Sequence, residues 1–459
     1  MALSDMRKRV ALIRPLAGSD QTELQEPLGA EALCGYLRLY GVECRVFDRQ
    51  IDRLVNRKTL AAVQSYAPTH IGFSVMTVEE AQDAAQMLLM LQGTAKFCVG
   101  GLFVTTNDAL AAAIFPKDTL LIRGEGEAAI LQWVMGEPQS PVSPDGWAFA
   151  SRDEAQLYLE RGGVLNLRTS AGCPGCCTFC ATPVLPNGEN HWRGRDLELI
   201  ADEMEQLSKR FPPVFNFVDD HFGSTARIEE LIELLQKRKL RAAFSLELRA
   251  QSLISADLQT LKALHSGGLC RIFVGLESLD GQTQRGWGKI IDSEALLAAI
   301  DRCREAEIEV ALGYILWHRD STPASVLAEM KTLHQHGLLS VKTVFSRLIL
   351  FSGTRRTDET IRVPTEEPLT PQAQALYTKL TGRLAALYPL WTAAASVLPG
   401  AVCRDWLDHT QTAAPLRELL REMDDAVAEA VFSDSELPES TIRHLEERTH
   451  ALCTADFGG

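Results

Sequence analysis

The sequence predicts an α/β protein with two successive parallel sheets and a helical C-terminal extension. Short runs rich in branched residues alternate with amphipathic stretches twice, first from residue 10 and again from residue 164. A Pro- and Gly-containing stretch separates the two series, and after residue 360 the pattern is helical only. We therefore expect a first domain over 1–135, a linker over 136–155, a second domain over 156–360 and a helical region over 361–459.

The first series predicts a doubly wound, Rossmann-like parallel sheet. Its ligands should bind beyond the carboxyl ends of the strands. No GxGxxG follows the first strand, so a dinucleotide is not favoured. The expected strands are 10–13, 43–48, 70–75, 96–99 and 119–122, with a helix over 29–40.

The second series predicts a partial (β/α)6 barrel, whose active residues should follow the carboxyl ends of its strands. The six expected strands are 164–169, 214–218, 242–246, 271–276, 310–315 and 342–350.

The C-terminal region predicts three helices, over 372–387, 414–431 and 440–453. Four aromatic residues of this region could cover a substrate or, as is more usual, belong to a core: Tyr377, Tyr388, Trp391 and Trp406.

Composition narrows the class of protein. The formal net charge is −14, from 46 basic and 60 acidic residues, which disfavours a nucleic-acid partner. The cysteine count of 11 is odd and four lie in one loop, which favours a reducing compartment over a disulfide framework. We find neither a signal-peptide pattern nor a membrane-spanning run, so a cytoplasmic protein without a membrane partner is expected.

A loop after the first strand of the second series holds the most specific motif. Cys173, Cys177 and Cys180 form CxxxCxxC, and three thiolates leave one position of a metal centre open. The neighbouring Gly and Pro residues indicate a loop and not a packed core segment. The alternative is a structural zinc site completed by Cys176 or His191.

The motif resembles the signature of the radical S-adenosylmethionine (SAM) superfamily, with Phe179 as the aromatic residue before the last cysteine. The resemblance implies that the three cysteines hold a [4Fe-4S] cluster whose open iron binds SAM. Strand-end segments 217–220 and 274–278 also resemble this family, as does 351–354, where Ser352 replaces a proline. The residues that the resemblance assigns to SAM are Phe179, Asp219, Asp220, Glu247, Arg249, Glu277 and Ser278.

The first domain is similar to the cobalamin-binding domain that precedes the barrel in one class of this superfamily, and residues 192–195 resemble that class too. Glycine turns after strands also occur in any doubly wound sheet. Residues 15–28 lack histidine, so cobalt should have no protein histidine beneath it, and His70 is expected to be structural. The residues assigned to cobalamin are Leu16, Pro27, Leu28, Ser74, Met76, Thr77, Gly100, Gly101, Phe103, Gly124 and Glu125.

The resemblance implies a C-methyltransferase that acts on a small biosynthetic intermediate or a peptide. A 5′-deoxyadenosyl radical would remove a substrate hydrogen, and methylcobalamin would supply the methyl group. The cluster would need an external electron donor of the flavodoxin or ferredoxin type. The alternatives are a cyclase or rearrangement enzyme with the same cofactors, and a non-catalytic cobalamin- or metal-binding sensor. The sequence assigns no catalytic acid or base.

Overall fold

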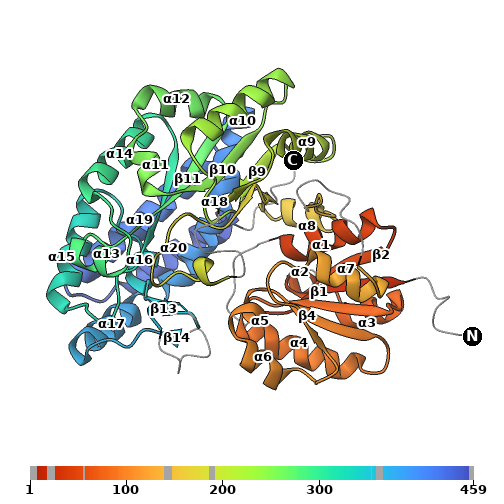
Figure 1. Cartoon of the computed structure of the whole chain (residues 1–459). Helices are drawn as coiled ribbons and strands as arrows, with labels where there is room; N and C mark the ends of the chain where they lie inside the picture. Colours follow the sequence, from red (N-terminus) through yellow and green to blue (C-terminus); the bar gives the residue numbers. More distant parts are fainter. Residues whose placement is uncertain are drawn as a thin grey trace, which may run out of the picture.

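The computed structural model describes residues 8–17, 26–54, 57–138, 147–185, 192–352, 354–357 and 365–453. Two α/β units lie side by side, and the C-terminal helices pack against the second unit (Figure 1). The predicted fold class is confirmed. Residues 139–146 of the expected linker and His191, the alternative zinc ligand, lie outside the described residues.

The first unit is a five-stranded sheet in which every strand pair is parallel, in the order β2-β1-β3-β4-β5. The order reverses between β1 and β3, and ligands of such sheets bind at this switch point. All five predicted strands are present: β1 (Arg9–Arg14), β2 (Glu43–Asp48), β3 (His70–Ser74), β4 (Lys96–Gly100) and β5 (Leu120–Leu121). The helices are α1 (Leu28–Leu39), α2 (Arg49–Leu54), α3 (Thr59–Tyr66), α4 (Val78–Leu91), α5 (Leu102–Thr106), α6 (Asp108–Ile114) and α7 (Glu127–Met135).

The second unit has a parallel sheet in the order β12-β11-β10-β9-β6. A short antiparallel ribbon, β7 with β8, follows β6. The strands are β6 (Leu165–Leu167), β7 (Ser170–Ala171), β8 (Arg193–Gly194), β9 (Val214–Phe217), β10 (Ala243–Leu248), β11 (Leu269–Glu277) and β12 (Glu309–Tyr314). The helices are α8 (Ala155–Leu159), η2 (Thr182–Val184), α9 (Leu197–Ser208), α10 (Thr225–Lys237), α11 (Ala250–Ile254), α12 (Leu258–Ser266), α13 (Gly281–Gly286), α14 (Ser293–Glu305) and α15 (Pro323–Gln335).

The prediction of a sixth barrel strand over 342–350 is wrong for the first half of that range. The chain forms α16 (Val341–Phe345) there, because the side chain of Ser340 caps the helix by accepting a hydrogen bond from the backbone N–H of Thr343. A single parallel bridge between Trp317 and Arg347 takes the place of the sixth strand. It leads into β13 (Ile349–Leu350), which pairs with β14 (Thr365–Glu366). A short apolar run does not distinguish helix from strand by periodicity alone.

The C-terminal region is helical as predicted, with one helix that the sequence pattern missed. Helix α18 (Leu387–Asp408) contains Pro399 and contacts β9, β10 and β11. A helix buried on several sides shows no amphipathic stripe, and proline is unfavourable inside a helix, so the local pattern does not predict α18. The other helices are α17 (Pro371–Leu384), α19 (Ala413–Phe432) and α20 (Glu439–Cys453).

The aromatic residues of this region belong mostly to the core. Tyr377, Trp391 and Trp406 pack against the buried cluster of the second unit. Tyr388 is partly exposed and contacts the ring of Phe345. Within the described ranges no single helix is long and apolar enough to cross a membrane, although α17 and α18, bent by 71°, satisfy length and composition as a pair.

A buried arginine joins the two units. Arg152, whose side chain is 1% exposed, pairs with Glu26, lies 3.9 Å from a carboxylate oxygen of Glu31, and reaches Glu203 of α9 at 3.5 Å. Its guanidinium also donates to the carbonyl of Asn166, whose N–H donates to Glu26 at 2.9 Å. Glu203 also pairs with Arg195 at 2.6 Å, so Arg152 is the cation that acidic groups of the two units share.

The carboxylates of this cluster outnumber the charge that Arg152 supplies. Burial raises the pKa of Glu31 well above its usual value, and Glu26 raises it further, while Arg152 opposes both. Both carboxylate oxygens of Glu31 lack a hydrogen-bond partner. The carboxyl of Glu31 therefore keeps its proton to a higher pH than an exposed glutamate does.

We expect Arg152→Met to destabilise the protein by about 3–5 kcal/mol, because it leaves buried carboxylates without their cation. Urea denaturation at neutral pH measures this loss. Arg53→Met, a change at an exposed arginine of α2, is the control. A loss below about 1 kcal/mol, the range of a surface ion pair, would contradict the role of Arg152.

The Glu31→Gln variant should be more stable than the parent, increasingly so as the pH rises from 5 to 8. Unfolded Glu31 releases its proton near pH ~4.3, whereas the folded protein holds it to higher pH. Unfolding above that pH therefore releases a proton, and the parent loses stability as the pH rises. Urea midpoints at several pH values test this, and a variant less stable than the parent at pH 8 would refute it.

Candidate functional site

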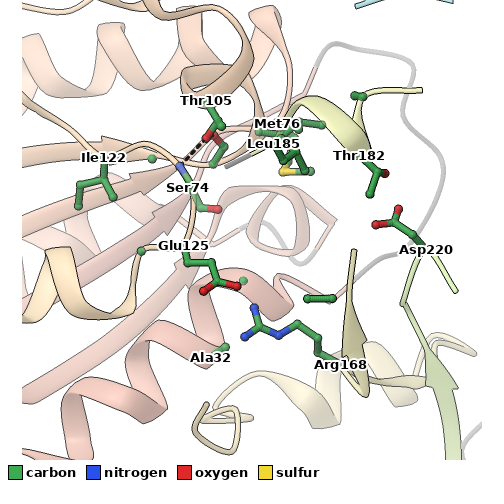
Figure 2. A pocket seen from close by; sticks show the side chains of 18 of the residues that line it. Ala32, Ser74, Met76, Thr105, Ile122, Glu125, Arg168, Thr182, Leu185 and Asp220 are labelled. Atoms are coloured by element: carbon green, nitrogen blue, oxygen red, sulfur yellow. Dashed lines mark hydrogen bonds between the residues drawn. The ribbon is translucent and has the colours of Figure 1, made fainter. Parts of the chain in front are cut away.

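A cavity of about 800 Å³ lies between the two units. Figure 2 shows Ser74, Thr105 and Glu125 on the side of the first unit, with Thr182 and Asp220 across from them. Met76 of the first unit and Leu185 of the second also line the cavity. The strand ends of the first sheet and the cysteine loop of the second unit therefore face one space. Predicted site residues that line the cavity are Ser74, Met76, Gly100, Gly101, Gly124, Glu125, Phe179, Cys180 and Asp220.

The loops on the side of the first unit are fixed by local bonds. The hydroxyl of Thr105 accepts the N–H of Gly124 at 3.0 Å, drawn as a dashed line in Figure 2. Gly101 has φ of 105°, and a Cβ there would lie 2.4 Å from the carbonyl oxygen of Val75. Only glycine permits this approach of two strand-end loops. Glu80 holds the next loop by accepting the N–H of Met76.

Five residues predicted to contact cobalamin support these loops without lining the cavity. The N–H of Leu16 donates to Asp83 at 2.9 Å, and Thr77 caps α4 by accepting the N–H of Glu80. Pro27 and Leu28 form the start of α1, and Phe103 is 1% exposed in the core of the first unit.

His70 is structural, as expected. Its ring packs edge-on against Trp133 at 4.7 Å between centroids, and Nδ1 lies 2.9 Å from the hydroxyl of Thr69. Burial, then Lys96, lowers its pKa to about 4. His70 is not among the residues that line the cavity.

The cysteine loop is held by its backbone from two distant segments. The N–H of Thr178 donates to the carbonyl of Trp287 at 2.9 Å, and the carbonyl of Thr178 accepts the N–H of Arg356 at 3.0 Å. Phe179 packs edge-on against Trp287, with 5.3 Å between ring centroids. These contacts therefore fix the part of the loop around Thr178 and Phe179 relative to the cavity.

The thiols of the motif lie close enough to affect one another. Burial raises the pKa of Cys177, Lys289 and Arg249 oppose this, and Cys180 and Cys173 add to it. The three motif cysteines are half-buried, whereas Cys176 is exposed. Among the residues described, no three His, Cys, Asp or Glu side chains converge on a single-ion site. A four-iron cluster takes one thiolate at each iron, so this donor set fits it.

A group of carboxylates faces the region between the cysteine loop and the barrel strands. Burial raises the pKa of Asp220, which lines the cavity. Burial, then Asp220 and Asp219, raises the pKa of Glu247 to about 7. Such a group is costly without a cation, so it suits a positively charged ligand.

Two predicted SAM contacts instead stabilise turns. Asp219 accepts the N–H groups of Thr169 and Ser170 at 2.8 and 2.9 Å, which fixes the entry to the cysteine loop. Burial nonetheless raises the pKa of Asp219 to about 6. Ser278 is fully buried, and its hydroxyl accepts the N–H of Asp280 at 3.1 Å.

Of the other two predicted contacts, Arg249 lies beside a thiol, and Glu277 pairs with a lysine whose charge acts on Cys177. Glu277, with φ of 70°, forms a 2.6 Å ion pair with Lys289. The guanidinium of Arg249 donates to the sulfur of Cys173 at 3.6 Å.

Two ion pairs across the cavity were not foreseen. Arg168 pairs with Glu127 at 3.3 Å, Arg193 pairs with Glu125, and all four residues line the cavity. Both guanidinium groups face the ring of Trp147, at 4.1 and 5.8 Å from its centroid. Arg193 belongs to the segment 192–195, which resembles the cobalamin-dependent class, and that resemblance predicts no ion pair. No local pattern marks partners that are 41 and 68 residues apart.

We expect Glu247→Gln to stabilise the ligand-free protein at pH 8 by about 3–4 kcal/mol, at ~1.36 kcal/mol per pKa unit. A carboxyl with a folded-state pKa of about 7 favours folding while protonated, and this contribution is lost as the pH rises from ~4.3 to 7. The advantage should therefore be small at pH 5. Chemical denaturation at both pH values measures it, with Glu233→Gln on the exposed face of α10 as control. An equal advantage at both pH values would contradict the shift.

Residues 167–341 match the profile of the radical SAM superfamily. Bacteriochlorophyllide d C-8(2)-methyltransferase of Chlorobaculum tepidum is 24% identical over 184 residues, which cover 38% of this chain and 40% of that one. The 4'-phospho-dehydrooxetanocin synthase of Priestia megaterium is 28% identical over 177 residues, which cover 34% of this chain and 23% of that one. The chain thus spans less than half the length of these curated relatives.

Solved structures match over a larger share of this chain than the curated relatives do. The cobalamin-dependent SAM radical enzyme OxsB with aqua-cobalamin bound has a TM-score of 0.68 at 15% identity, covering 97% of this chain and 79% of that one. The radical SAM methyltransferase TsrM of Kitasatospora setae has a TM-score of 0.59 at 17% identity, covering 76% and 74%. The resemblance inferred from the cysteine loop is confirmed: residues 167–341 are a radical SAM domain, and the chain has the fold of the cobalamin-dependent radical SAM enzymes.

Proposed function

We propose that this protein is a cobalamin-dependent radical SAM enzyme that methylates a carbon of a small biosynthetic intermediate or a peptide. The observation that carries the proposal is the shared cavity, which is lined by strand-end loops of the first sheet and by Cys180 and Phe179 of the cysteine loop. Methyltransferases among the relatives support the choice of reaction. Two cofactors that must act on one substrate need such a common space.

Each side of the cavity suits one cofactor. The loops after β3, β4 and β5 would hold cobalamin, since Ser74 offers a hydroxyl and Gly100 and Gly124 expose backbone there. Cys173, Cys177 and Cys180 would hold a [4Fe-4S] cluster, with SAM at its open iron. When bound, these groups supply the one-electron cleavage of SAM and a transferable methyl group.

The protein contributes position and charge. Asp220 and Glu247 provide negative charge for the ammonium or sulfonium of SAM, and a bound cation would lower their raised pKa values. Phe179, fixed by Trp287, supplies an apolar wall beside the cluster loop. The Arg168–Glu127 and Arg193–Glu125 pairs bridge the two units at the cavity. An external electron donor of the flavodoxin or ferredoxin type would reduce the cluster.

A ring-forming or rearrangement reaction is the second candidate. The sequence likeness to 4'-phospho-dehydrooxetanocin synthase, whose name gives no methyl transfer, favours it. Product mass separates the two reactions, because methylation adds one methyl group and rearrangement does not.

We expect Cys177→Ala to lower 5′-deoxyadenosine formation more than about a hundredfold, since changes outside the ligand set alone cost ~10–100-fold. The test is anaerobic reconstitution with iron, sulfide, hydroxocobalamin and SAM, followed by mass spectrometry for 5′-deoxyadenosine, S-adenosylhomocysteine and methylated product. Cys176→Ala, at the exposed thiol of the same loop, should retain the parent rate.

Two results would overturn the proposal. One is SAM cleavage that persists in Cys177→Ala. The other is purified protein that contains zinc without iron and sulfide, which would favour a metal-binding sensor.

A further inference from the structure

The sulfur of Cys173 accepts two hydrogen bonds within the protein. The backbone N–H of Gly175 donates to it at 3.4 Å, and Nη1 of Arg249 donates at 3.6 Å. Arg249 lies 76 residues beyond Cys173 in the sequence, so this contact is a product of the fold. Hydrogen bonds to cluster sulfurs are one of the means by which proteins set reduction potentials.

The loop leaves space for this guanidinium. A Cβ built on Gly175 would lie 2.1 Å from Nη1 of Arg249 and 3.4 Å from the sulfur of Cys173. Any other residue at position 175 would therefore displace the guanidinium from the sulfur. Gly175 is buried in the middle of the motif, so the chain cannot easily move away.

The backbone of Arg249 is tied to the segment that begins the cysteine loop. Its N–H donates to Nδ1 of His221 at 3.4 Å. The carbonyl of His221 accepts the hydroxyl of Ser170 at 2.9 Å and the indole N–H of Trp192 at 2.7 Å. Ser170 belongs to β7, immediately before the loop. The donor and the thiol are thus held on one connected framework.

The positive charge of Arg249 acts on the thiols and is not neutralised by a carboxylate of the described residues. Two cations act on Cys177, and one of them, Lys289, is paired with Glu277 at 2.6 Å. Within the described part of the chain, the side chain of Arg249 has the Cys173 sulfur as its hydrogen-bond partner and forms no ion pair. A cation next to a thiolate favours the state with the greater negative charge.

We infer that Arg249 is a positioning residue that raises the reduction potential of the cluster through its hydrogen bond to Cys173. The inference rests on the proposed function, since it requires the cluster. Reduction adds one electron from the external donor to the cluster, and no proton or bond is exchanged. The guanidinium stabilises the added negative charge at the Cys173 sulfur. The role differs from the SAM contact that the sequence predicts for Arg249.

The test is a redox titration of the reconstituted cluster, followed by electron paramagnetic resonance, without SAM, cobalamin or substrate. In Arg249→Gln the ratio of reduced to oxidised cluster at a fixed potential should fall about tenfold, equivalent to about 59 mV for one electron. Gly175→Ala should shift it in the same direction, because it displaces the guanidinium while keeping every thiol. Arg249→Lys should lie between Arg249→Gln and the parent. Arg285→Gln, at an exposed arginine of α13, should match the parent.

The inference is overturned if Arg249→Gln keeps the parent potential while binding SAM more weakly, since Arg249 would then be a SAM contact. Iron and sulfide are assayed in every variant. If Arg249→Gln loses its cluster, the Gly175→Ala variant provides the test instead. An unchanged reduction potential in Gly175→Ala would contradict the proposed role of Arg249. A parent protein that titrates normally but forms no product would contradict the proposed function and leave this result standing.

Discussion

The arrangement of the whole molecule depends on the buried cation of Arg152. Glu26 and Glu31 of the first unit and Glu203 of the second face the same guanidinium, which is 1% exposed. Such a cluster is weak evidence for net stability, because desolvation offsets the attraction. Its effect is to fix geometry, since acidic groups from both units meet one cation only when the units are correctly placed.

That placement creates the cavity. The order β2-β1-β3-β4-β5 puts the switch point of the first sheet at one wall, and the loop after β6 forms the other. Neither sheet encloses the space alone. The Arg168–Glu127 and Arg193–Glu125 pairs then join the two walls beside the cavity. Exposed pairs of this kind contribute little to stability, but they add to the alignment that Arg152 sets.

The cysteine loop combines a motif that is local in the sequence with support from distant parts of the chain. Its thiols are contiguous in the sequence, yet Trp287 and Arg356 hold the backbone of Thr178, and Arg249 donates to Cys173. All three come from segments far along the chain. The sequence motif therefore brings the thiols together locally, while the groups that surround them are assembled by the barrel.

The sequence by itself determined the order of most elements, the two sheets, the CxxxCxxC motif and six of the residues that line the first wall of the cavity. These follow from local periodicity, turn chemistry and motif spacing, which are properties of neighbouring residues. Only the tertiary structure decided that 341–345 is helical, that α18 packs on the sheet, and that Thr77, Phe103, Asp219 and Ser278 support loops without lining the cavity. It also decided the pairing of Arg152, Arg168 and Arg249. Each of these outcomes depends on partners far apart in the chain, and a local pattern carries no information about them.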